Sequence, residues 1–266
     1  MALRTLVTGV HILVVDDFVL VELALAQVIQ DTPHTLVGVR DPRNLPEALS
    51  EGPRFDLALV DINFGPGAPT GLTAMRILTE LSPETKIVIE STDEERNRLL
   101  FLLASFAFFE PAGLLSKASP AEAIRALIDA IDRGERPLSP VDRLVGNKDL
   151  LDELIRSGTD LGLWRALVRF DKRGEVARAA HVDERTVDRF TASKSLVVDK
   201  IQAEFPEDAS APAARSDPDG PRRNPNLVRL ARFAQTHSHF FADQAIDGLF
   251  AARWQAPRPR QRRSWR

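Results

Sequence analysis

The sequence contains no cysteine among its 266 residues. A disulfide scaffold, a thiolate zinc site and a cysteine nucleophile are therefore excluded. Long apolar runs are also lacking, because the run at residues 99–109 is about half the length of a membrane span. With no cleavage signal near the first residues, we expect a soluble, cytoplasmic protein that does not bind membranes.

Charge is distributed unevenly along the chain, although the overall net charge is only −3. Acidic residues outnumber basic ones in residues 1–134, whereas basic residues predominate in residues 221–266. Such an asymmetry indicates separate modules with different partners. The length also suits two domains better than one.

Short apolar runs alternate with segments of helical periodicity through the first half of the chain. The expected strands cover residues 11–15, 35–40, 55–60, 86–89 and 113–116. A helical segment follows each of them, which is typical of a parallel sheet covered on both faces. We therefore predict an α/β fold of the flavodoxin-like (βα)5 type over residues 1–134.

The second half of the chain lacks a strand signal. Residues 135–149 contain Pro137 and Pro140 and are expected to form a linker. Residues 150–205 show a short helix, a turn and a longer helix, which is the order of a helix-turn-helix. We therefore predict a second, all-α helix-turn-helix domain there.

Residues 206–266 are expected to form a flexible segment, one helix and an Arg-rich tail. The first part is rich in Pro, Ala, Ser and Asp, and the helical pattern covers residues 226–250. Such a tail adds non-specific affinity for nucleic acid, binds the acidic first domain, or has no selected role. The sequence leaves these three alternatives open.

Polar residues stand at the ends of four of the expected strands. Asp16 and Asp17 end the first strand, Asp61 the third, Ser91 the fourth and Lys117 the fifth. Ligands of doubly wound sheets bind at this edge. Carboxylates held close together repel one another, and Mg²⁺, which prefers oxygen ligands, removes that repulsion.

Asp61 is the candidate nucleophile, because it ends the central strand and a Gly-rich loop follows it. Lys117 would neutralise phosphoryl oxygens, and the Ser91 hydroxyl would donate a hydrogen bond to them. Each residue also has a structural alternative, since an Asp pair after a strand often caps the next helix. The conjunction at four strand ends favours function.

These segments resemble the receiver domain of two-component response regulators. The matching stretches are residues 12–17, 56–61, 87–92 and 114–120. The resemblance implies that Asp61 accepts a phosphoryl group from a histidine kinase, with Ser91 as the switch hydroxyl and Lys117 as the phosphate-contacting lysine. It also implies that the residues holding Mg²⁺ are Asp16, Asp17, Asp61 and, through its backbone carbonyl, Asn63.

Three residues depart from the receiver pattern. Gly65 stands where the family usually has proline, Leu114 where it usually has an aromatic residue, and Glu90 where it has an apolar one. We expect phosphorylation to remain possible and the output route to differ. The expected helix at residues 94–108 is unusually apolar, which ordinary core burial or a dimer surface would explain.

Residues 175–187 resemble the output domain of the NarL/LuxR class of regulators. Thr186 would then fall early in the recognition helix. The other candidates for DNA contact on this helix are Arg185, Arg189, Thr191, Ser193 and Lys194. Acidic neighbours such as Asp183, Glu184 and Asp188 would be repelled by phosphate, so a helical bundle that binds protein remains an alternative.

We therefore expect a response regulator that dimerises when Asp61 is phosphorylated and then binds paired DNA half-sites. One alternative is a phospho-signalling adaptor whose C-terminal helices bind protein. Another is an orphan DNA-binding regulator that is not controlled by phosphorylation. We do not expect an enzyme, because no nucleophile with a positioned base is visible outside the carboxylate cluster.

Overall fold

The computed structural model describes residues 9–64, 68–92, 98–135, 142–206 and 224–255. The chain divides into two compact units, residues 1–151 and residues 152–266. Gly65, Pro137, Pro140 and the tail beyond residue 255 lie outside the described residues. So do residues 207–223, most of the stretch expected to be flexible.

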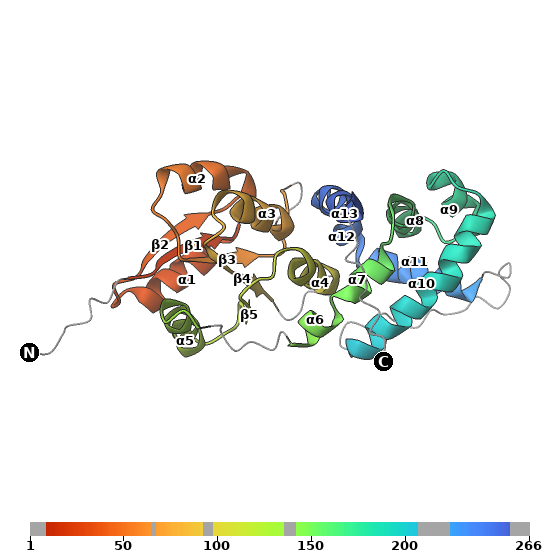
Figure 1. Ribbon diagram of the computed structural model, residues 1–266. Helices are drawn as coiled ribbons and strands as arrows, with labels where there is room; N and C mark the ends of the chain where they lie inside the picture. The colour runs from red at the N-terminus through yellow and green to blue at the C-terminus, as the bar shows by residue number, and fades with distance from the viewer. Residues whose placement is uncertain (1–8, 65–67, 93–97, 136–141, 207–223, 256–266) are drawn as a thin grey trace, which may run out of the picture. The chain divides into compact units, whose positions relative to one another are not determined.

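The first unit contains a five-stranded parallel sheet, which confirms the predicted α/β fold (Figure 1). The strand order is β2-β1-β3-β4-β5. The strands are β1 (His11–Val15), β2 (Thr35–Val39), β3 (Leu57–Asp61), β4 (Lys86–Ser91) and β5 (Gly113–Ser116). The central strand β3 is buried along its whole length, as expected of a parallel strand covered on both faces.

Five α-helices follow these strands in turn. They are α1 (Val19–Ile29), α2 (Leu45–Glu51), α3 (Gly71–Leu81), α4 (Arg98–Phe108) and α5 (Ala121–Asp132), with a 3₁₀ turn η1 (Pro42–Asn44) before α2. Helix α1 contacts α5, whereas α3 contacts both α2 and α4, so the helices form two groups. This layering forms because the apolar faces of the strands and the apolar stripe of each helix must both be buried, and packing helices on the sheet buries both.

A short helix lies inside the expected linker, and a second begins at its last residue. They are α6 (Asp142–Asn147) and α7 (Asp149–Leu154). Leu144, Leu150 and Leu151 are all buried, and α6 packs against α4. The linker prediction rested on two prolines, but the leucines that follow them supply enough apolar surface for packed helices.

The second unit consists of helices among its described residues. They are α8 (Gly158–Arg169), α9 (Arg173–Ala179), α10 (Glu184–Glu204), α11 (Pro225–Thr236), α12 (Ser238–Ala242) and α13 (Ala245–Gln255). Three helices therefore replace the single one expected at residues 226–250. The helical backbone is interrupted at His237, with φ −102° and ψ 27°, and at Asp243, where it is extended.

An aromatic cluster around Trp164 forms the centre of the second unit. Its ring stacks on Phe241 at 5.2 Å and lies 5.6 Å from Phe233 and 5.1 Å from Phe190. The indole Nε1 donates a hydrogen bond to the Leu154 carbonyl at 2.9 Å. Helices α11 and α12 therefore complete this core, because they carry Phe233 and Phe241. None of the described helices in either unit has the length and apolar character needed to cross a bilayer.

We expect Phe241→Ala to destabilise the second unit by about 3–5 kcal/mol, because it removes a ring stacked on Trp164 and leaves a cavity. The matched control is Leu196→Ala on α10, where the side chain is 66% exposed and the loss stays within about 0.5 kcal/mol. Urea unfolding followed by tryptophan fluorescence measures both, since all three tryptophans belong to this unit. Equal midpoints for the two variants would contradict this account of the core.

Candidate functional site

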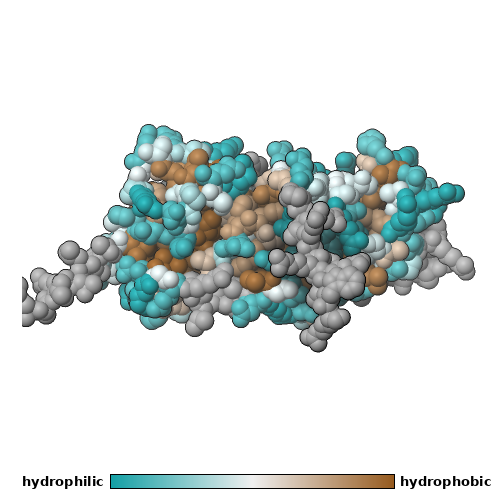
Figure 2. Space-filling model, in the orientation of Figure 1, coloured by the Kyte–Doolittle hydropathy of each residue, from teal (hydrophilic) through white to brown (hydrophobic). Residues whose placement is uncertain are grey.

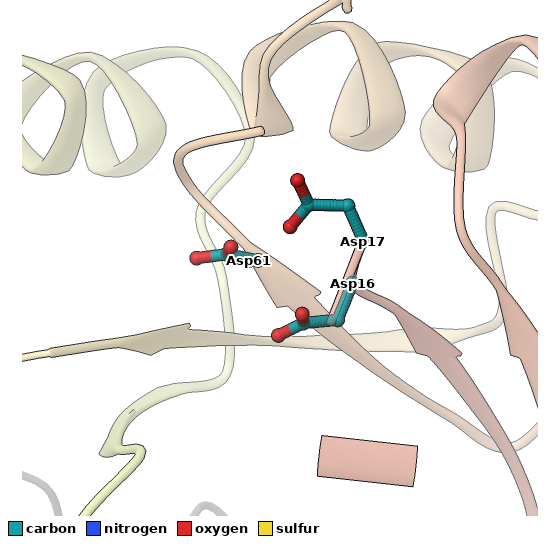
Figure 3. A group of neighbouring side chains, drawn as sticks. All are labelled: Asp16, Asp17 and Asp61. Atoms are coloured by element: carbon teal, nitrogen blue, oxygen red, sulfur yellow. The ribbon is translucent and has the colours of Figure 1, made fainter. Parts of the chain in front are cut away.

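Three carboxylates gather where β1 and β3 end (Figure 3). One oxygen from each of Asp16, Asp17 and Asp61 lies within 4.8 Å of the others. Strands β1 and β3 are neighbours in the sheet, with Val15 opposite Val60, so Asp16 and Asp61 follow at the same level. Asp16 and Asp61 are buried, whereas Asp17 is exposed and leaves the cluster open to water.

Lys117 joins the cluster from the end of β5. Its Nζ atom lies 2.8 Å from Asp16 Oδ2 and 2.8 Å from Asp61 Oδ2. Burial opposes the charge on this ammonium, but the two carboxylates outweigh burial and raise the pKa of Lys117. The lysine therefore stays charged and holds two buried aspartates that would otherwise repel each other.

The cluster fits a hard divalent cation. Its ligand atoms are all oxygens, and three carboxylates with one ammonium leave a net charge of about −2 when all are ionised. Asp16 Oδ2 is buried, and its described partner is the Lys117 ammonium at 2.8 Å. The Asn63 amide lies 3.4 Å from Asp61 Oδ1, which keeps that residue beside the cluster.

The helix-capping alternative for the Asp pair does not hold. The residue at the N-cap of α1 is Phe18, and no side chain caps this helix. Asp16 Oδ1 accepts a hydrogen bond from the Phe18 amide at 2.7 Å, which fixes its carboxylate in place. Gly71 allows α3 to begin close to Asp61, since a Cβ at that position would lie 2.2 Å from the Asp61 carbonyl oxygen.

The Ser91 hydroxyl is buried at the end of β4 and donates to the Thr92 carbonyl at 3.3 Å. The same carbonyl accepts a hydrogen bond from Arg98 Nη1 at 3.0 Å. The backbone amide of Lys117 donates to the Ser91 carbonyl at 2.9 Å, so the ends of β4 and β5 are joined. The fold thus brings Ser91 and Lys117 to the edge that carries the carboxylates.

Glu90 is a fourth carboxyl group near the cluster. It lies opposite Asp61 in the register of β3 and β4, is only 3% exposed, and its Oε2 atom has no hydrogen-bond partner. Burial, together with the charges of Asp16 and Asp61, raises the pKa of Glu90 to about 7. Sequence reasoning marked this residue only as a departure from the receiver pattern.

An apolar patch at the start of α1 lies directly after the acidic pair. Its members, which we call the α1 patch, are Phe18, Val19, Leu20 and Leu23, with exposed fractions of 39–60%. In Figure 2, brown hydrophobic surface interrupts the teal surface of the first unit. Sequence reasoning missed the patch, although apolar residues at almost every position from 18 to 26 were a visible signal that α1 has no polar face.

The second unit contains the expected pair of helices joined by a tight turn. Helices α9 and α10 pack against each other, and Val176, Ala177 and Val187 are buried. His181 in the turn adopts φ 54°, which reverses the chain. Asp183 begins α10 by accepting a hydrogen bond from the Thr186 amide at 2.6 Å, as an N-cap residue does.

The residues expected to contact DNA differ in exposure. Arg185 and Arg189 are exposed, whereas Thr186 and Ser193 are half-buried. Arg173 pairs with the acidic Glu184 and Asp188, which reduces the negative charge near the start of α10. Among the described residues, neither Arg185 nor Arg189 takes part in an ion pair.

Lys194 is a correction to the expected set. Its side chain is 2% exposed, and Nζ lies 2.6 Å from Asp160 Oδ2 and 2.7 Å from the Glu153 carbonyl oxygen. Burial lowers the pKa of Lys194, and the Asp160 carboxylate partly offsets this. Thr191 is also buried and donates to the Val187 carbonyl. Both side chains are core residues, because α7 and α8 cover this side of α10.

Comparison with known proteins supports the fold and goes no further. No family model matches the sequence, and no curated protein matches it. Among solved structures, the RcsB response regulator of Salmonella typhimurium is similar, with a TM-score of 0.50, 15% identity, and coverage of 73% of this chain and 93% of that one. At this identity the match shows that the two chains share a fold.

Two other solved structures are similar at lower scores. The signal receiver domain of an HD domain-containing protein from Pseudomonas fluorescens has a TM-score of 0.44 and 19% identity, covering 50% of this chain and 94% of that chain. The response regulator ChrA of a heme-sensing two-component system has a TM-score of 0.40 and 18% identity, covering 86% of this chain and 99% of that one.

The buried Glu90 predicts a pH dependence of stability. Its pKa is about 7 in the folded protein, against about 4.5 for an unperturbed glutamate, so folding favours its protonated form. The contribution of Glu90 to the free energy of unfolding is therefore fully present below pH 4.5 and is lost as the pH rises to about 7. The loss lowers that free energy by about 2–3 kcal/mol. We expect Glu90→Gln to stabilise the first unit by up to that amount at pH 8 and by little at pH 4.5.

Urea unfolding of wild type and variant in EDTA, followed by circular dichroism, measures this difference. Glu47→Gln on α2 is the control, because Glu47 is exposed. A stability difference between Glu90→Gln and wild type that does not change with pH would refute the assignment.

Proposed function

We propose that this chain is a response regulator, in which a phosphoryl group on Asp61 controls DNA binding by the second unit. The observation that carries this proposal is the position of the Lys117 ammonium, 2.8 Å from both Asp16 and Asp61 at the carboxyl edge of the sheet. A charged lysine beside two buried carboxylates, in a cluster that the exposed Asp17 opens to water, suits the binding of phosphoryl oxygens. The shared fold supports this reading.

Phosphoryl transfer would form a bond between an Asp61 carboxylate oxygen and phosphorus. The bond that breaks joins phosphorus to a histidine nitrogen of a kinase, and its electron pair stays on the imidazole. Asp16, Asp17, Asp61 and the Asn63 carbonyl would hold Mg²⁺, which neutralises negative charge on the carboxylates and the donor. Lys117 would then contact the transferred group, and Ser91 would turn from the Thr92 carbonyl toward it.

Incubation with Mg²⁺ and acetyl phosphate tests this chemistry without a kinase. We expect the intact mass of the wild-type protein to rise by one phosphoryl group, and Asp61→Asn to show no such rise. Asp129→Asn on α5 is the control and should be modified like wild type, because Asp129 is exposed and distant from the strand ends. Unmodified wild-type protein would favour a regulator that is not controlled by phosphorylation.

A histidine kinase is the partner that best explains the α1 patch. The patch starts at Phe18, immediately after Asp16 and Asp17, so a protein seated on it would lie beside Asp61. Exposed apolar side chains of this size mark protein contacts rather than small-molecule sites. The patch therefore suits a phosphodonor that is itself a protein.

DNA is the proposed partner of the second unit, and α10 would enter the major groove. Arg185 and Arg189 are exposed on the first turns of this helix, and Thr186 lies between them. Ser193 lies further along α10, where phosphate contacts are more plausible than base contacts. Lys194 is not among the proposed contacts, because it is buried. Two copies joined on activation would meet paired half-sites.

Binding to DNA sites selected from random duplexes by the wild-type protein tests this role. We expect Arg185→Ala and Arg189→Ala each to weaken binding by about 1–3 kcal/mol, with relaxed specificity if the contact is to a base and a smaller salt slope if it is to a phosphate. Lys86→Ala, which removes the same charge from an exposed site on β4, is the control and should bind normally.

The adaptor alternative predicts a different result. Acidic residues at 183, 184 and 188 stand at the start of α10, and a surface of mixed charge suits a protein partner. If the wild-type protein selects no DNA sequence at any salt concentration, with or without an acyl phosphate mimic, the second unit is better assigned to protein binding.

A further inference from the structure

An open pocket lies between the start of α8 and one side of α10. Its volume is about 260 Å³, and the residues that line it belong to the second unit. Those that carry guanidinium or hydroxyl groups are Arg156, Ser157, Thr159, Thr186, Arg189 and Ser193. Donors of this kind on two separate helices suit a ligand with several oxygen atoms.

The pocket carries an excess of positive charge. Arg156 and Arg189 are exposed, and neither takes part in an ion pair within the described part of the chain. The carboxylate in the lining belongs to Asp160 and is already bound. Its Oδ2 atom lies 2.6 Å from Lys194 Nζ and accepts a hydrogen bond from the Arg156 amide at 2.9 Å. The two guanidinium charges are therefore left to attract an anion.

The acidic residues of α10 lie away from this pocket. The α10 residues that line the pocket are three and four positions apart, so they share one side of the helix. Glu184 and Asp188, also four positions apart, share another side and pair with Arg173 on α9. An anion can therefore approach α10 from the side of α8 without meeting these two carboxylates.

The Arg-rich tail follows a helix that ends beside the start of α8. Helix α13 ends at Gln255, and the Trp254 ring lies 3.6 Å from where a Cβ on Gly158 would stand. In the sequence, Gly158 stands between two of the lining residues of the pocket. Arg253 pairs with Asp152, which also holds the end of α13 in place. The tail therefore begins near the pocket.

The tail supplies the positive charge that the helix pair lacks. Residues 256–266 contain five arginines and no acidic residue, whereas residues 160–205 hold nine basic and eight acidic residues. A nearly neutral helix pair gains little from attraction to phosphate, which supplies much of the affinity of proteins for DNA. Eleven residues span at most about 35 Å, close to one turn of duplex DNA, so the tail is long enough to follow a backbone.

We propose that the DNA-binding surface of the second unit continues from α10 through the pocket to the tail, where Arg156 and the tail arginines contact backbone phosphates. This inference rests on the proposed function. A guanidinium group binds phosphate oxygens through two parallel N–H groups. Such contacts hold a protein on the duplex without reading its sequence. Helix α10 then reads the bases, and residues outside it supply much of the affinity.

The salt dependence of DNA binding by the full-length protein tests this surface. Binding is measured on the duplex that the wild type selects, with Mg²⁺ and beryllium fluoride, an acyl phosphate mimic, present throughout. We expect Arg156→Gln to reduce the salt slope by about 0.9 and to weaken binding about fivefold at about 0.15 M salt. Replacement of the five tail arginines by glutamine should reduce the slope further, and base preference should be unchanged in both variants. The control is Arg54→Gln, which removes the same charge from an exposed site in the first unit.

Single methylphosphonates, each of which removes the charge of one DNA phosphate, locate the contact. We expect one position at which this change weakens binding by wild type and by Arg54→Gln but not by Arg156→Gln, because the last variant has already lost that contact. Wild-type affinity and salt slope in Arg156→Gln or in the tail variant would overturn the continuous surface, while the Arg185 and Arg189 variants would still test the proposed function. A changed base preference would overturn the assignment to phosphates. If the wild type selects no DNA, this surface and the proposed DNA binding are both refuted.

Discussion

The contact of one ammonium with two buried aspartates is the interaction on which the first unit depends. Two buried carboxylates this close repel each other, because burial limits how far water screens their charges. Lys117 offsets that repulsion from the end of β5, and the third carboxylate, Asp17, lies in water. Since β1, β3 and β5 come from distant parts of the chain, the cluster exists only when the sheet is complete.

The charge at this edge of the sheet depends on a fourth carboxyl group as well as on the three aspartates. Glu90 adds a carboxyl group with an unpartnered oxygen, and burial keeps much of it protonated near neutral pH. Ser91, its neighbour, connects the edge through the Thr92 carbonyl to Arg98 and so to α4. Glu90 therefore adds to the charge of the site, and Ser91 beside it connects the site to α4 by hydrogen bonds.

The fold of the first unit followed closely from local patterns. Short apolar runs such as residues 11–15 and 57–60 are typical of strands buried in a parallel sheet, and the helical periodicity between them favours parallel connections. The second unit was harder to predict, because helical periodicity does not say which helix covers which. Lys194 looked like a groove contact, but its ammonium is buried against Asp160, which lies 34 residues earlier in the chain.

The sequence by itself determined that Asp16, Asp17, Asp61, Ser91 and Lys117 stand at strand ends, since parallel strands bring their carboxyl ends to one edge whatever the details of packing. Only the tertiary structure decided that α6 packs against α4, that Phe18 and Leu20 remain exposed, and that α11 and α12 complete the core around Trp164. Whether a side chain is buried depends on which helices pack against it, and those helices come from distant parts of the chain.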